Sequence, residues 1–282
     1  MAGLGFEFIA TEEPEKQNKL SFNEAVNNAT NDLTGYGLLI SGPVKVDGEF
    51  HRVNHRDGKK NKSCWYVFFS NGDFVVGAFG NWREQSRETW CSVNQGEMSS
   101  QDKINFKQKM EEAKRLHEIE RKKVQDEAAK KAQKRWGDAQ NIGINHPYLV
   151  NKGIKPLGVK QEGVYILVPL SNRRGEITTI QSIDYDGNKK FMFGGEKKGC
   201  FFVIPGLPEL VLIAEGYSTG VSLHMASNAT VYMAMDAGNL NPVTAVAKTN
   251  HPNSKLAVCA DNDRFKDKNT GIEYGKAASL DH

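Results

Sequence analysis

The 282-residue sequence lacks several features that would place it in a special class of protein. No apolar stretch reaches the roughly 18 residues that a membrane-spanning helix needs, and the first residues do not resemble a signal peptide. Only four cysteines are present and none form a CxxC pair, which argues against a disulfide framework and against a zinc ribbon. We therefore expect a cytoplasmic protein with no membrane partner and no zinc site.

The sequence also lacks a strong excess of charge of one sign. Its net charge is +3, from 37 Lys and Arg against 34 Asp and Glu. This balance excludes a histone-like blanket of positive charge, but it allows a local basic surface that binds nucleic acid. At roughly 150 residues per domain, the length suggests about two domains.

The sequence of residues 1–98 predicts a small α+β module that could bind nucleic acid. Ser21 and Glu24 have the spacing of a capping box at the start of a helix over residues 21–30. Strand-like runs follow at 37–40, 50–54, 65–69 and 74–78. The last two are joined by Ser70-Asn71-Gly72-Asp73, which contains the Asn-Gly pair typical of hairpins.

Aromatic and basic residues alternate in this first module, and the pattern has two interpretations. The aromatic side chains either fill the core of a small sheet, or some of them stack on the bases of single-stranded nucleic acid. The aromatic residues are Trp65, Tyr66, Phe68, Phe69, Phe74, Phe79, Trp82 and Trp90. The basic ones are His51, Arg52, Arg56, Lys59, Lys60, Lys62 and Arg83.

Residues 99–137 predict one long linking helix. No Gly or Pro occurs before Gly137, and good helix formers predominate. Ser99 and Asp102 could cap its start. Between residues 102 and 135, twelve Lys and Arg stand against seven Asp and Glu. The helix is therefore either a solvated spacer or a basic strut that lies along a nucleic-acid backbone.

The remaining sequence predicts a mostly β, basic subdomain over residues 138–205 and an α/β domain over residues 206–282. In the latter, short apolar runs at 210–214, 230–235 and 255–260 alternate with helical segments at 218–227, 242–248 and 271–280. Apolar strands that alternate with helices are typical of a parallel sheet with crossover helices.

Acidic residues directly follow the three predicted strands of this α/β domain. Glu215 follows the first strand, Asp236 the second, and Asp261 and Asp263 the third. The carboxyl ends of parallel strands meet at one edge of the sheet, where α/β proteins bind their ligands. Because clustered carboxylates repel one another, the pattern favours a divalent cation such as Mg²⁺, which prefers oxygen ligands.

The segments LVLIAEGYSTG and VCADND resemble the Toprim domain. Further segments, in the same order along the chain, resemble the Toprim primases of phages and conjugative plasmids. These are GEFHRVNHRDGKKNKSCWYVFFSNGDFVVGAFGNWR, HPYLVNKGI, YILVPLSNRRGEITTIQSIDYDGNKKFMFGG, AEGYSTGVSLHMA, MAMDAGNL and ADND. The resemblance implies a Toprim-like sheet at the C-terminus, preceded by the small α+β module and the long helix.

The resemblance also implies roles for individual residues. Glu215 would bind metal and act in acid/base chemistry, and Asp261 and Asp263 would hold Mg²⁺ or Mn²⁺. Asp236 would be a further metal ligand. Four basic residues, Lys189, Lys190, Arg173 and Arg174, would bind nucleic acid or nucleotide.

This sequence departs from the family in three places. Thr219 replaces the aspartate that follows the glutamate by four residues in bacterial primases. The family's compact Cys/His zinc module is not recognisable, and His51, His55, Cys64 and Cys91 are badly spaced to replace it. The chain also ends soon after the last predicted helix, so we expect a truncated Toprim domain or a fragment of a longer protein.

The implied activity is that of a DNA primase, a nucleotidyltransferase that uses Mg²⁺ to synthesise short primers on single-stranded DNA during phage or plasmid replication. Its partners would be the template, nucleoside triphosphates and a replicative helicase, in the cytoplasm of a bacterial host. Two alternatives are a Toprim nuclease that acts on DNA and a non-catalytic module that binds nucleic acid or protein.

Overall fold

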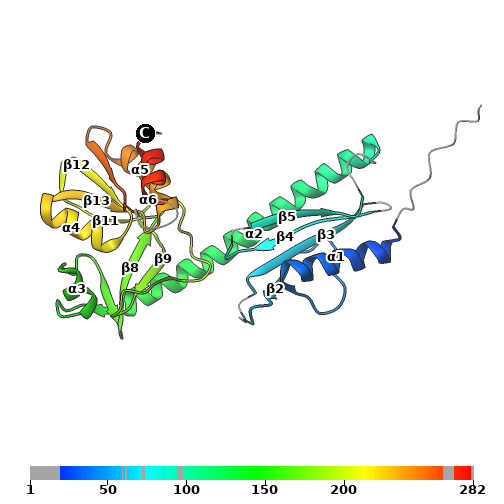
Figure 1. The fold of residues 1–282 in the computed structure, drawn as a ribbon, viewed down its shortest axis with the longest axis horizontal. Coiled ribbons are helices and arrows are strands. Elements are labelled where there is room, and N and C mark those ends of the chain that lie inside the picture. The colour runs from blue at the N-terminus through cyan, green and yellow to red at the C-terminus, as the bar shows by residue number, and fades with distance from the viewer. Residues whose placement is uncertain are drawn as a thin grey trace, which may run out of the picture. The chain divides into compact units, whose positions relative to one another are not determined.

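The computed structural model describes residues 20–262 and 270–280, except residues 59, 61, 72, 73, 85 and 94–97. The chain divides into two compact units, Met1–Glu120 and Arg121–His282, each of which is described by itself (Figure 1). Within the described ranges, no helix combines the length and the apolar character that crossing a membrane requires.

The first unit contains an antiparallel sheet whose strands follow one another in chain order. Its elements are α1 (Phe22–Tyr36), β1 (Leu38–Leu39), β2 (His51–His55), β3 (Cys64–Asn71), β4 (Phe74–Asn81) and β5 (Ser86–Cys91). The predicted capping box is present: the Ser21 hydroxyl accepts from the backbone N–H of Glu24, and the Glu24 carboxylate accepts from the backbone N–H of Ser21. The β3–β4 pair confirms the predicted hairpin, although Gly72 and Asp73 lie outside the described residues.

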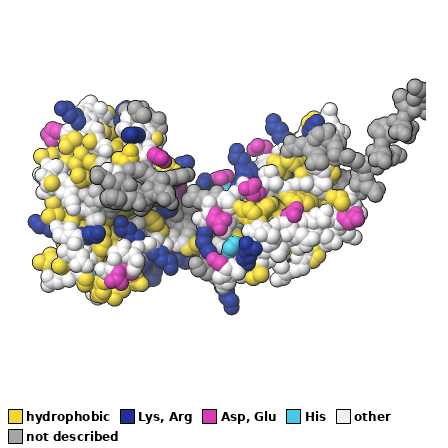
Figure 2. Space-filling model, viewed as in Figure 1, with side chains coloured by type: hydrophobic (Ala, Val, Ile, Leu, Met, Phe, Trp, Pro, Cys, Tyr) yellow, Lys and Arg dark blue, Asp and Glu magenta, His cyan; other side chains and the backbone are white. Residues whose placement is uncertain are grey.

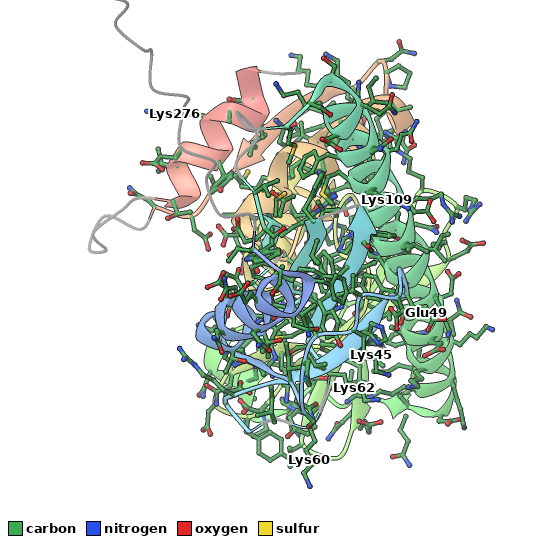
Figure 3. The ribbon with its side chains drawn as sticks, turned by 90° about the vertical axis from the view of Figure 1, so that its right-hand side faces the viewer. Lys45, Glu49, Lys60, Lys62, Lys109 and Lys276 are labelled. Atoms are coloured by element: carbon green, nitrogen blue, oxygen red, sulfur yellow. The ribbon has the colours of Figure 1, made fainter. Side chains whose placement is uncertain are left out.

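The aromatic residues of this sheet mostly form its core. Alternate residues of β3 enter different hydrophobic clusters, because side chains along a strand point to opposite faces. Tyr66 and Phe68 pack with α1, whereas Trp65 and Phe69 pack with residues of the long helix. Base stacking is therefore a wrong interpretation for six of the eight aromatics: Trp65, Tyr66, Phe68, Phe69, Phe74 and Phe79 are all buried. Basic residues such as Lys45, Lys60 and Lys62 are exposed (Figure 3).

The long helix α2 (Ser100–Asp138) is more than a solvated spacer. In the first unit its Phe106, Met110 and Ala113 pack against the sheet. In the second unit its Ala132 packs with Leu167 and Ile180 of another sheet. Helix positions three or four residues apart share a face, so each part of α2 presents one narrow apolar stripe to its own unit.

The charges of α2 are largely mixed along its length. Lys122 pairs with Asp126 at 2.8 Å, Lys134 with Asp138 at 2.6 Å, and Glu112 with Arg115 at 2.6 Å. Basic and acidic side chains are also interspersed on the face shown in Figure 2. These pairs place charges of opposite sign side by side, but they leave the helix with the excess of positive charge that the basic-strut interpretation requires, so that interpretation stays a prediction.

The second unit begins with a five-stranded antiparallel sheet in the order β10-β9-β8-β7-β6. Its elements are β6 (Gln140–Asn141), α3 (Pro147–Lys152), β7 (Lys160–Glu162), β8 (Tyr165–Ser171), β9 (Ile177–Ile183) and β10 (Lys189–Phe191). All of these elements lie between Gln140 and Phe191.

A four-stranded sheet in the order β11-β13-β12-β14 follows. Its strands are β11 (Phe202–Ile204), β12 (Leu207–Ala214), β13 (Ala229–Met233) and β14 (Lys255–Cys259), and its helices are α4 (Tyr217–Ser227), the 3₁₀ turn η2 (Ala237–Asn239), α5 (Leu240–Asn250) and α6 (Thr270–Leu280). The three predicted strands are parallel, as expected. The sheet as a whole is mixed, however, because β11 pairs antiparallel with β13 at its edge.

The helices cover opposite faces of this mixed sheet. Tyr217 and Val221 of α4 pack on one face, and Val243 and Ala247 of α5 pack on the other. The α4 side shares its hydrophobic cluster with residues of α3 and β8, such as Tyr148. The two sheets of the second unit are thus built around a common core, which fixes the loops of one sheet against the strand ends of the other.

Candidate active site

The strand pairing places three of the predicted acidic residues at one edge of the mixed sheet. Ala214, the last residue of β12, pairs with Met233 of β13 on one side and with Cys259 of β14 on the other. Glu215 therefore follows the central strand, and Asp236 and Asp261 follow its two neighbours. Asp263 lies outside the described residues. The three described acids thus follow neighbouring strands at one edge of the sheet, but their carboxylate oxygens do not all lie within 4.8 Å of one another. Their convergence on one ion and their chemical roles remain predictions.

Glu215 is half-buried, and its Oε2 oxygen is fully buried. Gly216 follows with φ −128°, a conformation open to any residue. A Cβ added at Gly216 would lie 3.5 Å from Nζ of Lys189, which is an ordinary contact. The ammonium group of Lys189 on β10 is thus placed beside the backbone that follows Glu215. Thr219, which stands four residues after Glu215 where an aspartate was expected, is half-buried in the first turn of α4.

Asp236 has a cationic neighbour that the sequence analysis missed. Nζ of Lys197 lies 3.3 Å from Oδ2 of Asp236 and 4.8 Å from the centre of the Phe191 ring on β10. The residue before the aspartate, Met235, has φ +67°, which is uncommon for a bulky side chain. The backbone is therefore strained just beyond β13, in the turn that leads into Asp236.

The last helix, α6, packs closely against the backbone at Asp261 and so limits where this residue can lie. A Cβ at Gly271 of α6 would collide with the carbonyl oxygen of Asp261, and a Cβ at Gly275 would collide with the Cβ of Ala260. Residues four apart share one face of a helix, so both glycines turn toward this strand end. The Gly-x-x-x-Gly spacing is visible in the sequence and was the available signal for this contact.

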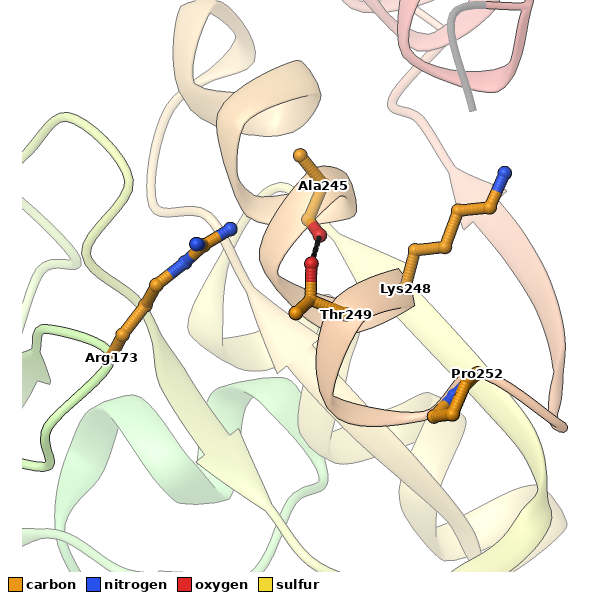
Figure 4. A pocket seen from close by; sticks show the side chains of 5 residues that line it. All are labelled: Arg173, Ala245, Lys248, Thr249 and Pro252. Carbon is orange, nitrogen blue, oxygen red and sulfur yellow. Dashed lines mark hydrogen bonds between the residues drawn. The ribbon is translucent and has the colours of Figure 1, made fainter.

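The remaining predicted basic residues are distributed differently. Lys190 is exposed on β10, and Arg174 pairs with Glu176 at 2.9 Å in the β8–β9 turn. Arg173 lines an open pocket of about 530 Å³ with residues of α5 and the segment after it: Ala245, Lys248, Thr249 and Pro252. In Figure 4 the Arg173 and Lys248 side chains run in a similar direction from opposite sides of the pocket, so their charged ends stay apart. Of the four predicted basic residues, Lys189 is the one placed at the acidic edge.

The first unit holds a separate group of potential metal ligands. Among the residues that the structure describes, only Asp47, Glu49 and His51 bring three candidate ligand atoms within 4.8 Å of one another. Asp47 and His51 already contact each other at 2.9 Å. The group lies near the start of β2, far along the chain from the acidic strand ends.

Tyr217 ties the segment that carries Glu215 to the preceding sheet. Its ring is fully buried, and its hydroxyl donates to the carbonyl oxygens of Leu157 at 3.2 Å and Lys155 at 3.5 Å. Burial raises the pKa of this phenol well above its ordinary value. The folded chain therefore holds the phenolic proton more tightly than the unfolded chain does.

This pKa shift predicts a loss of stability at alkaline pH. The unfolded chain releases the proton near pH 10, so the contribution is complete below about pH 10 and declines as pH rises above it. We expect the free energy of unfolding, measured by urea titration, to fall less steeply above this pH in Tyr217→Phe than in the wild type. Tyr274→Phe, at a residue that is 45% exposed, is the control and should follow the wild type. Parallel curves for all three proteins would contradict the assignment.

Comparisons with known proteins identify the mixed sheet. The sequence pattern of the Toprim domain matches residues 210–281. This part of the chain is a Toprim domain. Glu215, Asp236 and Asp261 thus lie at the carboxyl edge of the Toprim sheet.

Almost the whole chain is similar to proteins named DNA primase TraC. It is 29% identical to a DNA primase TraC of Escherichia coli over 283 residues, which cover 96% of this chain and 19% of that protein. A second TraC primase of Escherichia coli is 27% identical over 82% of this chain and 22% of its own length. The chain therefore spans about a fifth of the length of these relatives.

Solved structures show more distant likenesses. The primase fragment of the bacteriophage T7 primase-helicase protein covers 51% of this chain and 66% of its own, with 15% identity and a TM-score of 0.37. The DnaG primase catalytic domain, solved bound to single-stranded DNA, covers 52% of this chain and 48% of its own, with 17% identity and a TM-score of 0.28.

Proposed function

We propose that the chain carries the catalytic centre of a DNA primase, a nucleotidyltransferase that synthesises short primers on single-stranded DNA from nucleoside triphosphates. The observation that carries this proposal is the arrangement of Glu215, Asp236 and Asp261 at one sheet edge, with Lys189 and Lys197 beside them. Similarity to the TraC primases over almost the whole chain supports it. Cooperation with a replicative helicase, and replication of a phage or plasmid in the bacterial cytoplasm, belong to the same proposal.

The donor set fits a magnesium or manganese ion. Glu215 and Asp261 offer carboxylate oxygens from adjacent strand ends, and Asp263 follows two residues later; these are the ligands that such ions prefer. Asp236 stays a proposed member of the group, although one of its oxygens contacts Lys197. When bound, the metal would lower the pKa of the attacking 3′-hydroxyl and neutralise the leaving pyrophosphate.

The side chains of the protein supply the other parts of the reaction. Glu215 would accept the proton of the 3′-hydroxyl as that oxygen attacks the α-phosphorus of the incoming nucleotide. Lys189 and Lys197 would offset the negative charge of the triphosphate, which would otherwise be repelled by the carboxylates. Lys190, Arg173 and Arg174 would contact template phosphates, which gives affinity without sequence readout.

The test is a primer-synthesis assay with single-stranded DNA, ribonucleotides and Mg²⁺. We expect labelled oligonucleotides to appear with Mg²⁺ or Mn²⁺ and to be lost when EDTA removes the metal, because two or more carboxylates would then face the triphosphate alone. Far-UV circular dichroism with EDTA serves as the control that the fold persists. Cleavage of labelled DNA in place of synthesis would indicate a Toprim nuclease, and binding without turnover would indicate a non-catalytic module.

A further inference from the structure

A buried asparagine joins the acidic edge to the loop that carries Lys197. This loop, residues 192–201, connects β10 to β11, and we call it the lysine loop. Asn239 is only 4% exposed and lies at the end of η2, three residues after Asp236. Asn239 directly precedes α5, which packs on the Toprim sheet, so the backbone of Asn239 is held close to that sheet.

The Asn239 side chain makes hydrogen bonds on both sides. Its Oδ1 accepts from the backbone N–H of Gly199 at 2.8 Å, and its Nδ2 donates to the carbonyl oxygen of Cys200 at 2.9 Å. The same Nδ2 donates to the carbonyl oxygen of Ala234 at 2.8 Å, just beyond β13. Both hydrogens of the amide and its oxygen are therefore engaged. They join the end of the lysine loop that leads into β11 to the segment that follows β13, its partner strand in the mixed sheet.

A second contact fixes the lysine loop from its other side. The hydroxyl of Thr178 on β9 donates to the carbonyl oxygen of Glu196 at 2.9 Å. Thr178 thus attaches the loop to its own sheet, whereas Asn239 attaches it to the Toprim sheet. Lys197 lies between these two attachments, with its ammonium group against Asp236.

We infer that Asn239 is a positioning residue, which presents the ammonium group of Lys197 to the acidic edge and to the phosphates of an incoming nucleotide. The catalytic part of this inference rests on the proposed function. A long Lys side chain on a free loop has many rotamers and loses entropy when it binds. Asn239 fixes the backbone after Lys197, and Thr178 fixes the backbone before it, so part of the ordering of Lys197 is already present in the folded protein before the ligand binds.

The variants Asn239→Ala and Asn239→Asp remove the network in two ways. Alanine removes all three hydrogen bonds, and aspartate keeps the volume and an acceptor but loses both donors. Asn250→Ala is the matched control, because Asn250 lies at the far end of α5 and donates to the hydroxyl of Tyr232. Thermal unfolding of each variant identifies conditions in which all of them are folded.

The first readout requires no enzyme activity. Lysine acetylation by an N-hydroxysuccinimide ester, followed by peptide mass spectrometry, measures how accessible the Lys197 ammonium is relative to exposed Lys152. We expect several-fold faster acetylation of Lys197 in both Asn239 variants and no change in Asn250→Ala. Unchanged Lys197 reactivity in folded Asn239→Ala would overturn the inference, whether or not the chain makes primers.

The second readout is the kinetics of primer synthesis. We expect Asn239→Ala to raise KM for nucleoside triphosphate about tenfold with little change in kcat, since a hydrogen bond to a charged ligand is weakened. In a Lys197→Ala background the same substitution should raise KM no further, because Asn239 acts through Lys197. Equal effects in both backgrounds would overturn the inference. A wild-type protein that makes no primers would contradict the proposed function and leave the acetylation result to decide the role of Asn239.

Discussion

Glu215→Gln is expected to reduce primer synthesis by a factor of about 10²–10⁴ while the fold stays intact. The substitution keeps the size of the side chain but removes the negative charge that would bind metal and accept the proton of the 3′-hydroxyl. Glu215 directly follows β12, which lies between the two strands that precede Asp236 and Asp261. The measurement is the rate of labelled primer formation with Mg²⁺ at saturating nucleotide.

The same strand offers a matched control for this substitution. Glu209 lies near the opposite end of β12 and is exposed, so Glu209→Gln makes the same chemical change away from the acidic edge. We expect wild-type rates for Glu209→Gln and equal melting temperatures for both variants. Full activity of Glu215→Gln would show that primer synthesis does not use this carboxylate.

Gly271→Ala is expected to impair activity and to lower stability, although alanine favours helices. In an open helix position, replacing Gly with Ala stabilises by about 1 kcal/mol. At Gly271 the new Cβ would collide with the carbonyl oxygen of Asp261, so α6 or the end of β14 must shift. We expect a destabilisation of about 1–3 kcal/mol, as for other overpacked contacts, and a rate at least about tenfold lower because Asp261 is displaced.

Gly137→Ala is the control for Gly271→Ala, because it makes the same change in a helix without a collision. Gly137 lies near the end of α2, and a Cβ there would meet nothing within 4 Å. This variant should be stabilised by about 0.5–1 kcal/mol and keep full activity. Urea titration measures the stability of both variants, and the primer-synthesis assay measures their activity. Stabilisation of Gly271→Ala by the same amount would show that α6 does not press on Asp261.

The alternation of strands and helices in the Toprim part was predictable because each of its three parallel strands lies in a short apolar run that is followed by Glu or Asp. The capping box of Ser21 and Glu24 likewise marked the start of α1. Strand β5 was missed because its sequence, SRETWC, is mostly polar and exposed, as suits an edge strand. The antiparallel pairing of β11 was also missed, since no local pattern records which distant strand is its neighbour.

The sequence predicted which acidic residues lie at the sheet edge, and among the basic residues beside them it predicted Lys189 but not Lys197. Glu215, Asp236 and Asp261 follow their parallel strands by one to three residues, so the topology places them at one edge, although it does not bring all three carboxylates within 4.8 Å of one another. Lys197 lies in a loop with no regular structure, and its place beside Asp236 depends on tertiary hydrogen bonds of Asn239. Such contacts arise between segments that are distant along the chain and leave no periodic trace in the sequence.

The central claim is that the strand ends at Glu215 and Asp261, with Asp263, form one metal centre. Anomalous diffraction from crystals soaked in Mn²⁺ tests it directly. We expect manganese bound by carboxylate oxygens of these residues at about 2–2.5 Å, and loss of that peak in Glu215→Gln. Manganese found solely at Asp47, Glu49 and His51, with none near Glu215, would contradict it.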